Sequence, residues 1–286
     1  MDMWWKISLC LGTALAWSAA DVFRKKVAGR IPTEQFSFWI ALLQLPLFFL
    51  WALFSLDEQS LDFTADYWIL VVGCGLINAF TVLGMLLALR TAPLSVTIPL
   101  LSLTPLISAV IDWAWMGEGL NHLQFGGLCV ATLGAIALGI GEQGWFKMLG
   151  AWVMIGVALI FSLLCALDAI ALRTIPLGIH AFLELFFSVI FLAGFLFFRG
   201  QNEHFQRPPF LPTIFLAALS MTIALGIQLY AYQVGTAIAI VEAIKRPIGI
   251  VSSLLFGKML FEESMSIRKL GSAIVLTFGI LALLLG

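Results

Sequence analysis

The sequence predicts an all-α membrane protein in which ten transmembrane helices form two inverted repeats of five helices each. Three observations lead to this fold. Of the 286 residues, 62% are hydrophobic and only 11% are charged, which is too apolar for a soluble domain of this length. The apolar residues form ten runs separated by charged residues, proline and glycine. Similar short segments recur in the two halves of the chain.

Each apolar run is long enough to cross a bilayer as a helix, which takes about 20 residues. The predicted spans of the first half are residues 3–20, 35–56, 68–89, 94–116 and 123–140. Those of the second half are residues 149–169, 179–198, 211–232, 237–257 and 269–285. The segments between spans are too short to fold as separate domains, so we expect the function to reside within the membrane.

The two halves of the chain share features at corresponding places. The segment Ser-Ala-Ala-Asp that ends the first span at Asp21 resembles Cys-Ala-Leu-Asp, which ends the sixth span at Asp168. Pro105 in the fourth span corresponds to Pro247 in the ninth. Because five is an odd number of spans, the second copy must run through the membrane in the opposite direction. The predicted repeats cover residues 3–140 and 149–285.

The ninth span carries three charged residues near its middle, namely Glu242, Lys245 and Arg246. A charge at that depth costs about 2.5–3.5 kcal/mol on insertion scales, so these side chains should face a polar cavity or one another. Their spacing places them on one helix face. Pro247 lacks an N–H group, so we expect a kink or break beside them. Broken helices with ionisable groups at mid-depth are typical of transporter substrate sites.

Several roles are open to these charges. Lys245 and Arg246 could bind a phosphate or carboxylate group, or they could form an internal ion pair with Glu242. Glu184 in the seventh span, at a similar depth, could neutralise the second cation. Alternatively, Glu184 or Glu242 could serve as a proton-coupling group.

Polar residues in two other spans extend the candidate site. Asn78 lies near the middle of the third span, and Thr104 in the fourth span aligns with Arg246 across the repeat. Such residues often hydrogen-bond helices to one another, but they could also complete a substrate cavity. The candidate substrate-binding residues are therefore Lys245, Arg246, Glu242, Glu184, Thr104 and Asn78.

Other classes of function find little support. The four cysteines lie within apolar runs and form no C-x-x-C pair, and the three histidines lack the spacing of a helical metal site, so we predict no metal or cofactor. The net charge of −1 and the absence of a basic run argue against nucleic acid binding. The sequence contains neither a phosphate-binding loop nor a recognisable nucleophile motif, so we do not predict an enzyme. Glycines of the fifth and tenth spans favour close helix packing or a homodimer contact.

The distribution of basic residues predicts the orientation in the membrane. Most of the 15 lysines and arginines follow spans one, three, five, seven and nine, whereas Lys6 and Arg173 lie at the other face. The positive-inside rule then places both termini outside the cytoplasm. We expect an integral protein of a bacterial cytoplasmic membrane, surrounded by the lipid bilayer.

The chain resembles the drug/metabolite transporter superfamily in its ten-span form with two EamA domains. The resemblance rests on Ala-Leu-Arg-Thr-Ala-Pro at residues 88–93, on Pro105, and on Glu118 followed by Gln-Phe-Gly-Gly at residues 124–127. A narrower similarity, in residues 243–247 and 256–258, is to the Lys-Arg segment of sugar-phosphate/phosphate translocators. It implies that Lys245 and Arg246 contact a substrate phosphate.

These observations predict a secondary transporter that moves or exchanges a small organic anion, phosphorylated metabolites included, by alternating access. A flippase for a lipid-linked phosphate or sugar is one alternative. An exporter of amino acids or amphiphilic drugs is another. A non-transporting membrane subunit, whose charges hold a partner, is an alternative of a different class.

Overall fold

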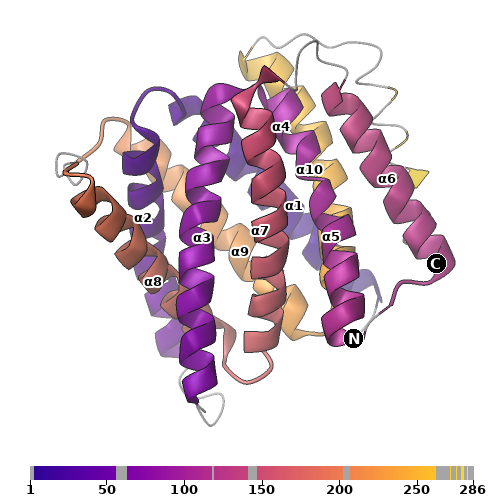
Figure 1. The fold of residues 1–286 in the computed structure, drawn as a ribbon, viewed down its shortest axis with the longest axis horizontal. Coiled ribbons are helices and arrows are strands. Elements are labelled where there is room, and N and C mark those ends of the chain that lie inside the picture. The colour runs from indigo at the N-terminus through magenta and orange to yellow at the C-terminus, as the bar shows by residue number, and fades with distance from the viewer. Residues whose placement is uncertain are drawn as a thin grey trace.

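The structure, a computed structural model, describes residues 3–55, 63–117, 119–140, 147–201 and 207–261 together with Gly271, Val275, Phe278, Gly279 and Ala282. These residues are almost entirely helical (Figure 1). The helices are α1 (Met3–Val27), α2 (Thr33–Phe54), α3 (Ala65–Thr91), α4 (Leu94–Leu100), α5 (Leu103–Ile111), the short π-helix η1 (Asp112–Met116), α6 (His122–Ile140), α7 (Leu149–Ala171), α8 (Leu177–Phe198), α9 (Leu211–Gln233) and α10 (Ile238–Phe261).

Within this described part, seven stretches are long and apolar enough to cross a membrane. They comprise α1 from Trp5, α2, α3, the segment Val96–Trp115, α7, α8 and α9. They match predicted spans one to four and six to eight, while α6 and α10 match spans five and nine. Most of the tenth predicted span, residues 269–285, lies outside the described residues. The prediction of an all-α membrane protein is confirmed.

The fourth predicted span is not one continuous helix, because α4 ends at Leu100 and α5 begins at Leu103. At the break, the Ser102 N–H donates to the Pro99 carbonyl at 3.0 Å, and the Thr104 N–H donates to the Leu101 carbonyl at 2.9 Å. Such three-residue bonds belong to a tighter 3₁₀ turn. Pro105 has no N–H and could not donate to Leu101 in a regular α-helix. A 3₁₀ turn therefore separates α4 from α5 at this point.

Of the kink or break expected beside Pro247, the break is absent, so that part of the prediction was wrong. α10 runs as one helix from Ile238 to Phe261 with Pro247 in its interior. α10 packs against α1, α4 and α5. Neighbouring helices can keep a membrane helix continuous across a missing hydrogen bond, which explains why this proline is tolerated. The broken helix thus lies in the first half of the chain rather than the second.

Helices of the two halves pack mainly against each other rather than within their own half. α1 contacts α9 and α10, α2 contacts α8 and α9, and α3 contacts α7 and α8. Figure 1 shows α3 and α7 side by side across the front of the bundle. In the predicted repeat, α1 corresponds to α7, α2 to α8 and α3 to α9. Replacing each helix by its counterpart turns the α1–α9 contact into the α7–α3 contact and leaves the α2–α8 contact unchanged. This pattern supports the inverted repeat, which stays a prediction together with its boundaries.

Glycine allows α3 to approach its neighbours closely. A Cβ atom at Gly75 would lie 2.5 Å from the Cβ of Phe187 and 2.9 Å from the carbonyl oxygen of Glu184, both on α8. A Cβ at Gly150, on α7, would lie 2.6 Å from the carbonyl oxygen of Ala88 on α3. Backbone contacts of this kind are characteristic of membrane helix packing. They bring α3, α7 and α8 together as one tightly packed group.

Candidate functional site

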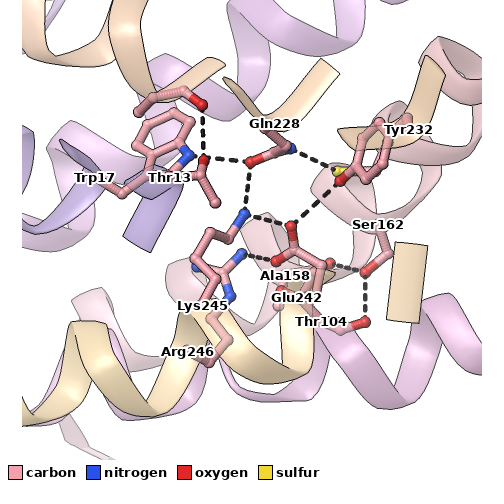
Figure 2. A network of polar contacts seen from close by, with 12 residues as sticks. Thr13, Trp17, Thr104, Ala158, Ser162, Gln228, Tyr232, Glu242, Lys245 and Arg246 are labelled. Atoms are coloured by element: carbon pink, nitrogen blue, oxygen red, sulfur yellow. Dashed lines mark hydrogen bonds and ion pairs between the residues drawn. The ribbon is translucent and has the colours of Figure 1, made fainter. Parts of the chain in front are cut away.

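The first half of α10 carries the three charged residues on one face, where they form a single ion cluster (Figure 2). Lys245 Nζ donates to Glu242 Oε1, and Arg246 Nη2 donates to Glu242 Oε2 at 2.6 Å. The three residues follow the three- and four-residue helical spacing that the sequence indicated. Glu242 and Lys245 are buried, whereas the side chain of Arg246 keeps 12% of its surface exposed. One carboxylate is therefore shared by two cations, which leaves a net positive charge.

The amide of Gln228, from α9, completes the surroundings of Lys245. Its Oε1 atom accepts hydrogen bonds from Lys245 Nζ at 2.7 Å and from Trp17 Nε1 at 3.0 Å. Its Nε2 atom lies 3.6 Å from Cys165 Sγ. These contacts orient the amide so that its oxygen faces the lysine. Gln228 and Trp17 were not among the residues predicted from the sequence, although Gln228 is a buried polar residue in an apolar helix.

Aromatic rings cover the cations on another side. Lys245 Nζ lies 5.6 Å from the ring centroid of Trp17 and 5.1 Å from that of Phe161, and Arg246 Cζ lies 5.5 Å from Phe161. Tyr232 donates a hydrogen bond to Glu242 Oε1 at 3.4 Å. A cation over an aromatic face is attracted by the ring quadrupole, more so when it is removed from water. The rings thus stabilise charged groups inside an otherwise apolar bundle.

A second ion pair lies on α1, near the ion cluster of α10. Arg24 Nη2 donates to Asp21 Oδ1 at 2.5 Å, and both residues are buried. Arg24 Cζ also lies 5.3 Å from the ring centroid of Trp17, so Trp17 contacts cations from both α1 and α10. This ion pair lies inside the bundle and reaches the same cavity as Lys245.

A cavity of about 70 Å³ joins these groups. It is lined by Trp17, Asp21, Arg24, Asn78, Thr81, Val82, Met85, Leu101, Val157, Phe161, Met221, Lys245 and Arg246. Of the predicted site residues, the structure thus brings Asn78, Lys245 and Arg246 to one cavity, with Glu242 bonded directly behind the two cations. The wall combines charged residues of both signs with an apolar surface.

Two predicted site residues lie away from this cavity. Thr104 lies in the first turn of α5 and is buried; its carbonyl oxygen accepts a hydrogen bond from Ser162 Oγ at 3.3 Å (Figure 2). Glu184 is buried on α8, within electrostatic range of Asp168 and His180. It does not neutralise the second cation as the sequence suggested, because Glu242 pairs with both.

Asp112 anchors the beginning of α10 and thereby positions the ion cluster. Its Oδ2 atom accepts a hydrogen bond from the backbone N–H of Ala239, the second residue of α10, at 2.9 Å. N–H groups in the first turn of a helix have no partner within the helix, and a carboxylate there also meets the positive end of the helix dipole. Since Asp112 belongs to η1, the broken fourth span holds the start of α10.

Comparisons with known proteins agree with this architecture. Residues 4–140 match the EamA-like transporter family. No curated protein sequence matches the chain. One solved structure, described only as "Crystal structure of protein", is similar with a TM-score of 0.67 and 17% sequence identity, covering 97% of this chain and 95% of that chain. At this identity the likeness concerns the fold, and it extends over both halves. The chain is thus an integral membrane protein whose residues 4–140 are similar to the EamA-like transporter family.

Proposed function

We propose that this membrane transporter moves or exchanges a small organic anion by alternating access, and that the cavity beside the ion cluster binds it. The proposal rests on one observation, the charge balance of the cavity. Three cations, Arg24, Lys245 and Arg246, face two carboxylates, those of Asp21 and Glu242. An unbalanced charge in a low-dielectric interior is costly, so an anionic ligand is the partner that the cavity lacks.

The donor groups of the two α10 cations support this role. An ammonium group has three donors and a guanidinium group has five, so pairing with Glu242 leaves donors on both. Within the described residues, the buried Nε atom of Arg246 has no hydrogen-bond partner. A carboxylate or phosphate could receive a fork of two hydrogen bonds from Arg246 and one from Lys245. Asn78, which also lines the cavity, would add an amide.

The rest of the cavity favours an anion with an apolar part. Met85, Leu101, Val157 and Phe161 contribute to the lining. Pockets that hold drug-sized ligands measure roughly 300–1,000 Å³, considerably more than the present cavity. Binding a metabolite therefore requires the helices around the cavity to separate, as an alternating-access cycle would allow.

An exporter of amino acids is the second candidate, favoured by the mixed charge of the cavity wall. Asp21 and Arg246 both line the cavity. A zwitterion could direct its carboxylate to Arg246 and its ammonium group to Asp21. Ligand-dependent thermal unfolding separates the two candidates. Asp21→Asn should weaken the binding of a zwitterion and leave the binding of a simple anion unchanged.

A ligand-dependent thermal unfolding series on the purified protein tests the proposal. Phosphorylated, carboxylated, zwitterionic, neutral and cationic compounds would be compared; a ligand at 100 times its Kd stabilises by about 2.7 kcal/mol. We expect anions to raise the Tm, and Lys245→Gln and Arg246→Gln to abolish the rise. Lys147→Gln, at an exposed lysine outside the cavity, is the matched control. Stabilisation by neutral or cationic compounds that persists in both cavity variants would contradict the anion site.

Transport into liposomes gives the second readout. Protein reconstituted with the stabilising anion inside should take up the labelled anion by exchange, and Arg246→Gln should stop uptake while Lys147→Gln does not. Binding without any exchange would favour the non-transporting subunit over the transporter.

A further inference from the structure

A second buried polar cluster lies between α3, α7 and α8, outside the cavity described above. Cys74 Sγ, a carboxylate oxygen of Asp168 and a ring nitrogen of His180 all lie within 4.8 Å of one another, and all three residues are buried. The residues come from three different helices. Spacing along a single helix could not reveal the group, so the sequence alone did not indicate it.

We propose that Cys74, Asp168 and His180 bind a divalent transition-metal ion of the zinc type, with Glu184 as the fourth ligand. A thiolate, an imidazole and a carboxylate are the ligands that zinc takes in proteins, and hard cations such as magnesium prefer oxygen alone. Glu184 follows His180 by four residues on α8 and therefore shares its helix face. This site is independent of the proposed anion cavity.

The grouped atoms of Cys74, Asp168 and His180 suit a tetrahedral ion after a small adjustment, and Glu184 would turn toward them as the fourth ligand. With metal–ligand bonds of about 2.0–2.3 Å, neighbouring ligand atoms of a tetrahedral site lie about 3.3–3.8 Å apart. His180 Nε2 already lies 3.3 Å from Asp168 Oδ1. The largest separation in the group, within 4.8 Å, requires side chains to move inward by about 1 Å. Gly75, next to Cys74, permits this close approach of α3 to α8.

Tyr67 occupies the position of an orienting partner. Its hydroxyl lies 3.3 Å from His180 Nδ1, which leaves Nε2 directed at Asp168. Histidines that ligate metals generally hold a hydrogen bond at the second ring nitrogen, which fixes the ring and its tautomer. On metal binding, Nε2 would lose its proton, and Nδ1–H would donate to the tyrosine oxygen. The thiol of Cys74 would also release its proton, as metal-bound thiols do.

The charge of the cluster supports a cation. Two carboxylic residues, Asp168 and Glu184, are buried here, and the Oε2 atom of Glu184 has no hydrogen-bond partner among the described residues. In that part of the chain, no lysine or arginine pairs with either of them. A divalent ion would offset two of the three negative charges that one thiolate and two carboxylates carry, which an apolar bundle accommodates far better than uncompensated charges.

The site lies near one end of the bundle. Asp168 lies within the last turn of α7 and His180 within the first turn of α8. Arg173, in the turn that joins these helices, is exposed. An ion bound there would tie α3, from the first half of the chain, to α7 and α8 from the second.

Cobalt binding to the full chain tests the proposal. Purified protein would be stripped with a chelator, dialysed and titrated with Co²⁺, which reports thiolate ligation by a near-ultraviolet charge-transfer band and tetrahedral geometry by visible bands. We expect one Co²⁺ per chain, displaced by Zn²⁺ but not by Mg²⁺. Cys74→Ser should remove the charge-transfer band and weaken binding at least tenfold. Tyr67→Phe should retain the band and weaken binding about 10- to 100-fold.

Matched controls separate ligation from folding. Cys10→Ser changes a buried cysteine on α1 and His122→Gln changes a histidine at the start of α6; both should bind cobalt like the wild type. Because Tyr67→Phe removes one hydroxyl only, it should elute like the wild type in size-exclusion chromatography and still show the weaker binding. The proposal is overturned if the wild type binds less than one Co²⁺ per chain, if the charge-transfer band survives Cys74→Ser, or if Tyr67→Phe binds normally.

Discussion

Glu242 is the only carboxylate bonded to Lys245 and Arg246 among the described residues, so its removal leaves two buried cations without an anion. Breaking a buried ion pair from one side costs about 3–5 kcal/mol. Glu242→Gln should therefore lower the unfolding free energy by that amount, measured by thermal unfolding in detergent. Lys245→Met should cost less, because Glu242 still pairs with Arg246.

The double variant Glu242→Gln/Lys245→Met provides the control for this prediction. It leaves one unpaired cation instead of two. Its loss of unfolding free energy should therefore be smaller than the sum of the losses in the two single variants. Additive losses would mean that the three groups do not act as one ion cluster.

The sequence predicted part of this site because helix geometry places residues three and four apart on one face. That rule was sufficient for Glu242, Lys245 and Arg246. It could not find Trp17 or Gln228, since contacts between helices depend on which faces meet. Estimated depth put Glu184 level with the cations, but depth does not say where around the bundle a side chain lies.

At the scale of single helices, the beginning of α10 depends on a side chain from another element. Asp112 Oδ2 accepts the Ala239 N–H, an arrangement equivalent to an N-cap. Losing such a cap costs about 0.5–2 kcal/mol. Asp112→Ala should lower the unfolding free energy by this amount and accelerate hydrogen exchange in the first turn of α10. Asp66→Ala, in the exposed first turn of α3, is the matched control; it should cost less stability and leave the hydrogen exchange of α10 unchanged.

Two glycines of α3 offer a test of helix contact against helix propensity. A Cβ at Gly75 would collide with α8, whereas a Cβ at Gly73 would meet nothing within 4 Å. Overpacking costs about 1–3 kcal/mol, so Gly75→Ala should destabilise the protein by that amount. Gly73→Ala should be neutral or stabilise it by up to about 1 kcal/mol, because alanine favours the helix. Equal Tm values for the two variants would argue against the close α3–α8 contact.

The prolines show that the sequence alone does not predict where a helix breaks. Pro247 was expected to break its helix, yet α10 is continuous, and the break lies between Pro99 and Pro105 instead. A single missing N–H can be tolerated where neighbouring helices pack, whereas two prolines six residues apart disturb consecutive turns. Sequence gives the position of each proline but not the packing that decides its effect.

For the molecule as a whole, hydropathy predicted the helices well because a chain in lipid must satisfy its backbone hydrogen bonds internally. It could not predict the pairing of helices across the two halves. Nothing in an apolar run says which neighbour it meets, since lipid tails and leucine side chains are equally apolar. The interleaving of α1 with α9 and of α3 with α7 therefore came from the structure alone.

The structure also groups the charged ends of the helices into two faces. Lys6 Nζ donates to the Gly235 carbonyl, which puts the start of α1 beside the turn between α9 and α10. At the other face, Lys25 near the end of α1 donates to the carbonyls of Leu89 and Ala92, at the end of α3. Gly150 at the start of α7 lies against Ala88, so Lys147, which precedes α7, belongs to this same face. Arg173, after the end of α7, belongs to the face of Lys6.

The positive-inside rule puts the face of Lys25 and Lys147 in the cytoplasm and the face of Arg173 outside it. Both positions are exposed, so single cysteines there can be labelled with a maleimide that does not cross membranes. In intact cells we expect Arg173→Cys to be labelled and Lys147→Cys to react only after permeabilisation. The wild type gives the background, because Cys10, Cys74 and Cys165 are buried and Cys129 is partly buried. The reverse pattern would place the start of α1 in the cytoplasm, and labelling of both variants in intact cells would argue against a single orientation.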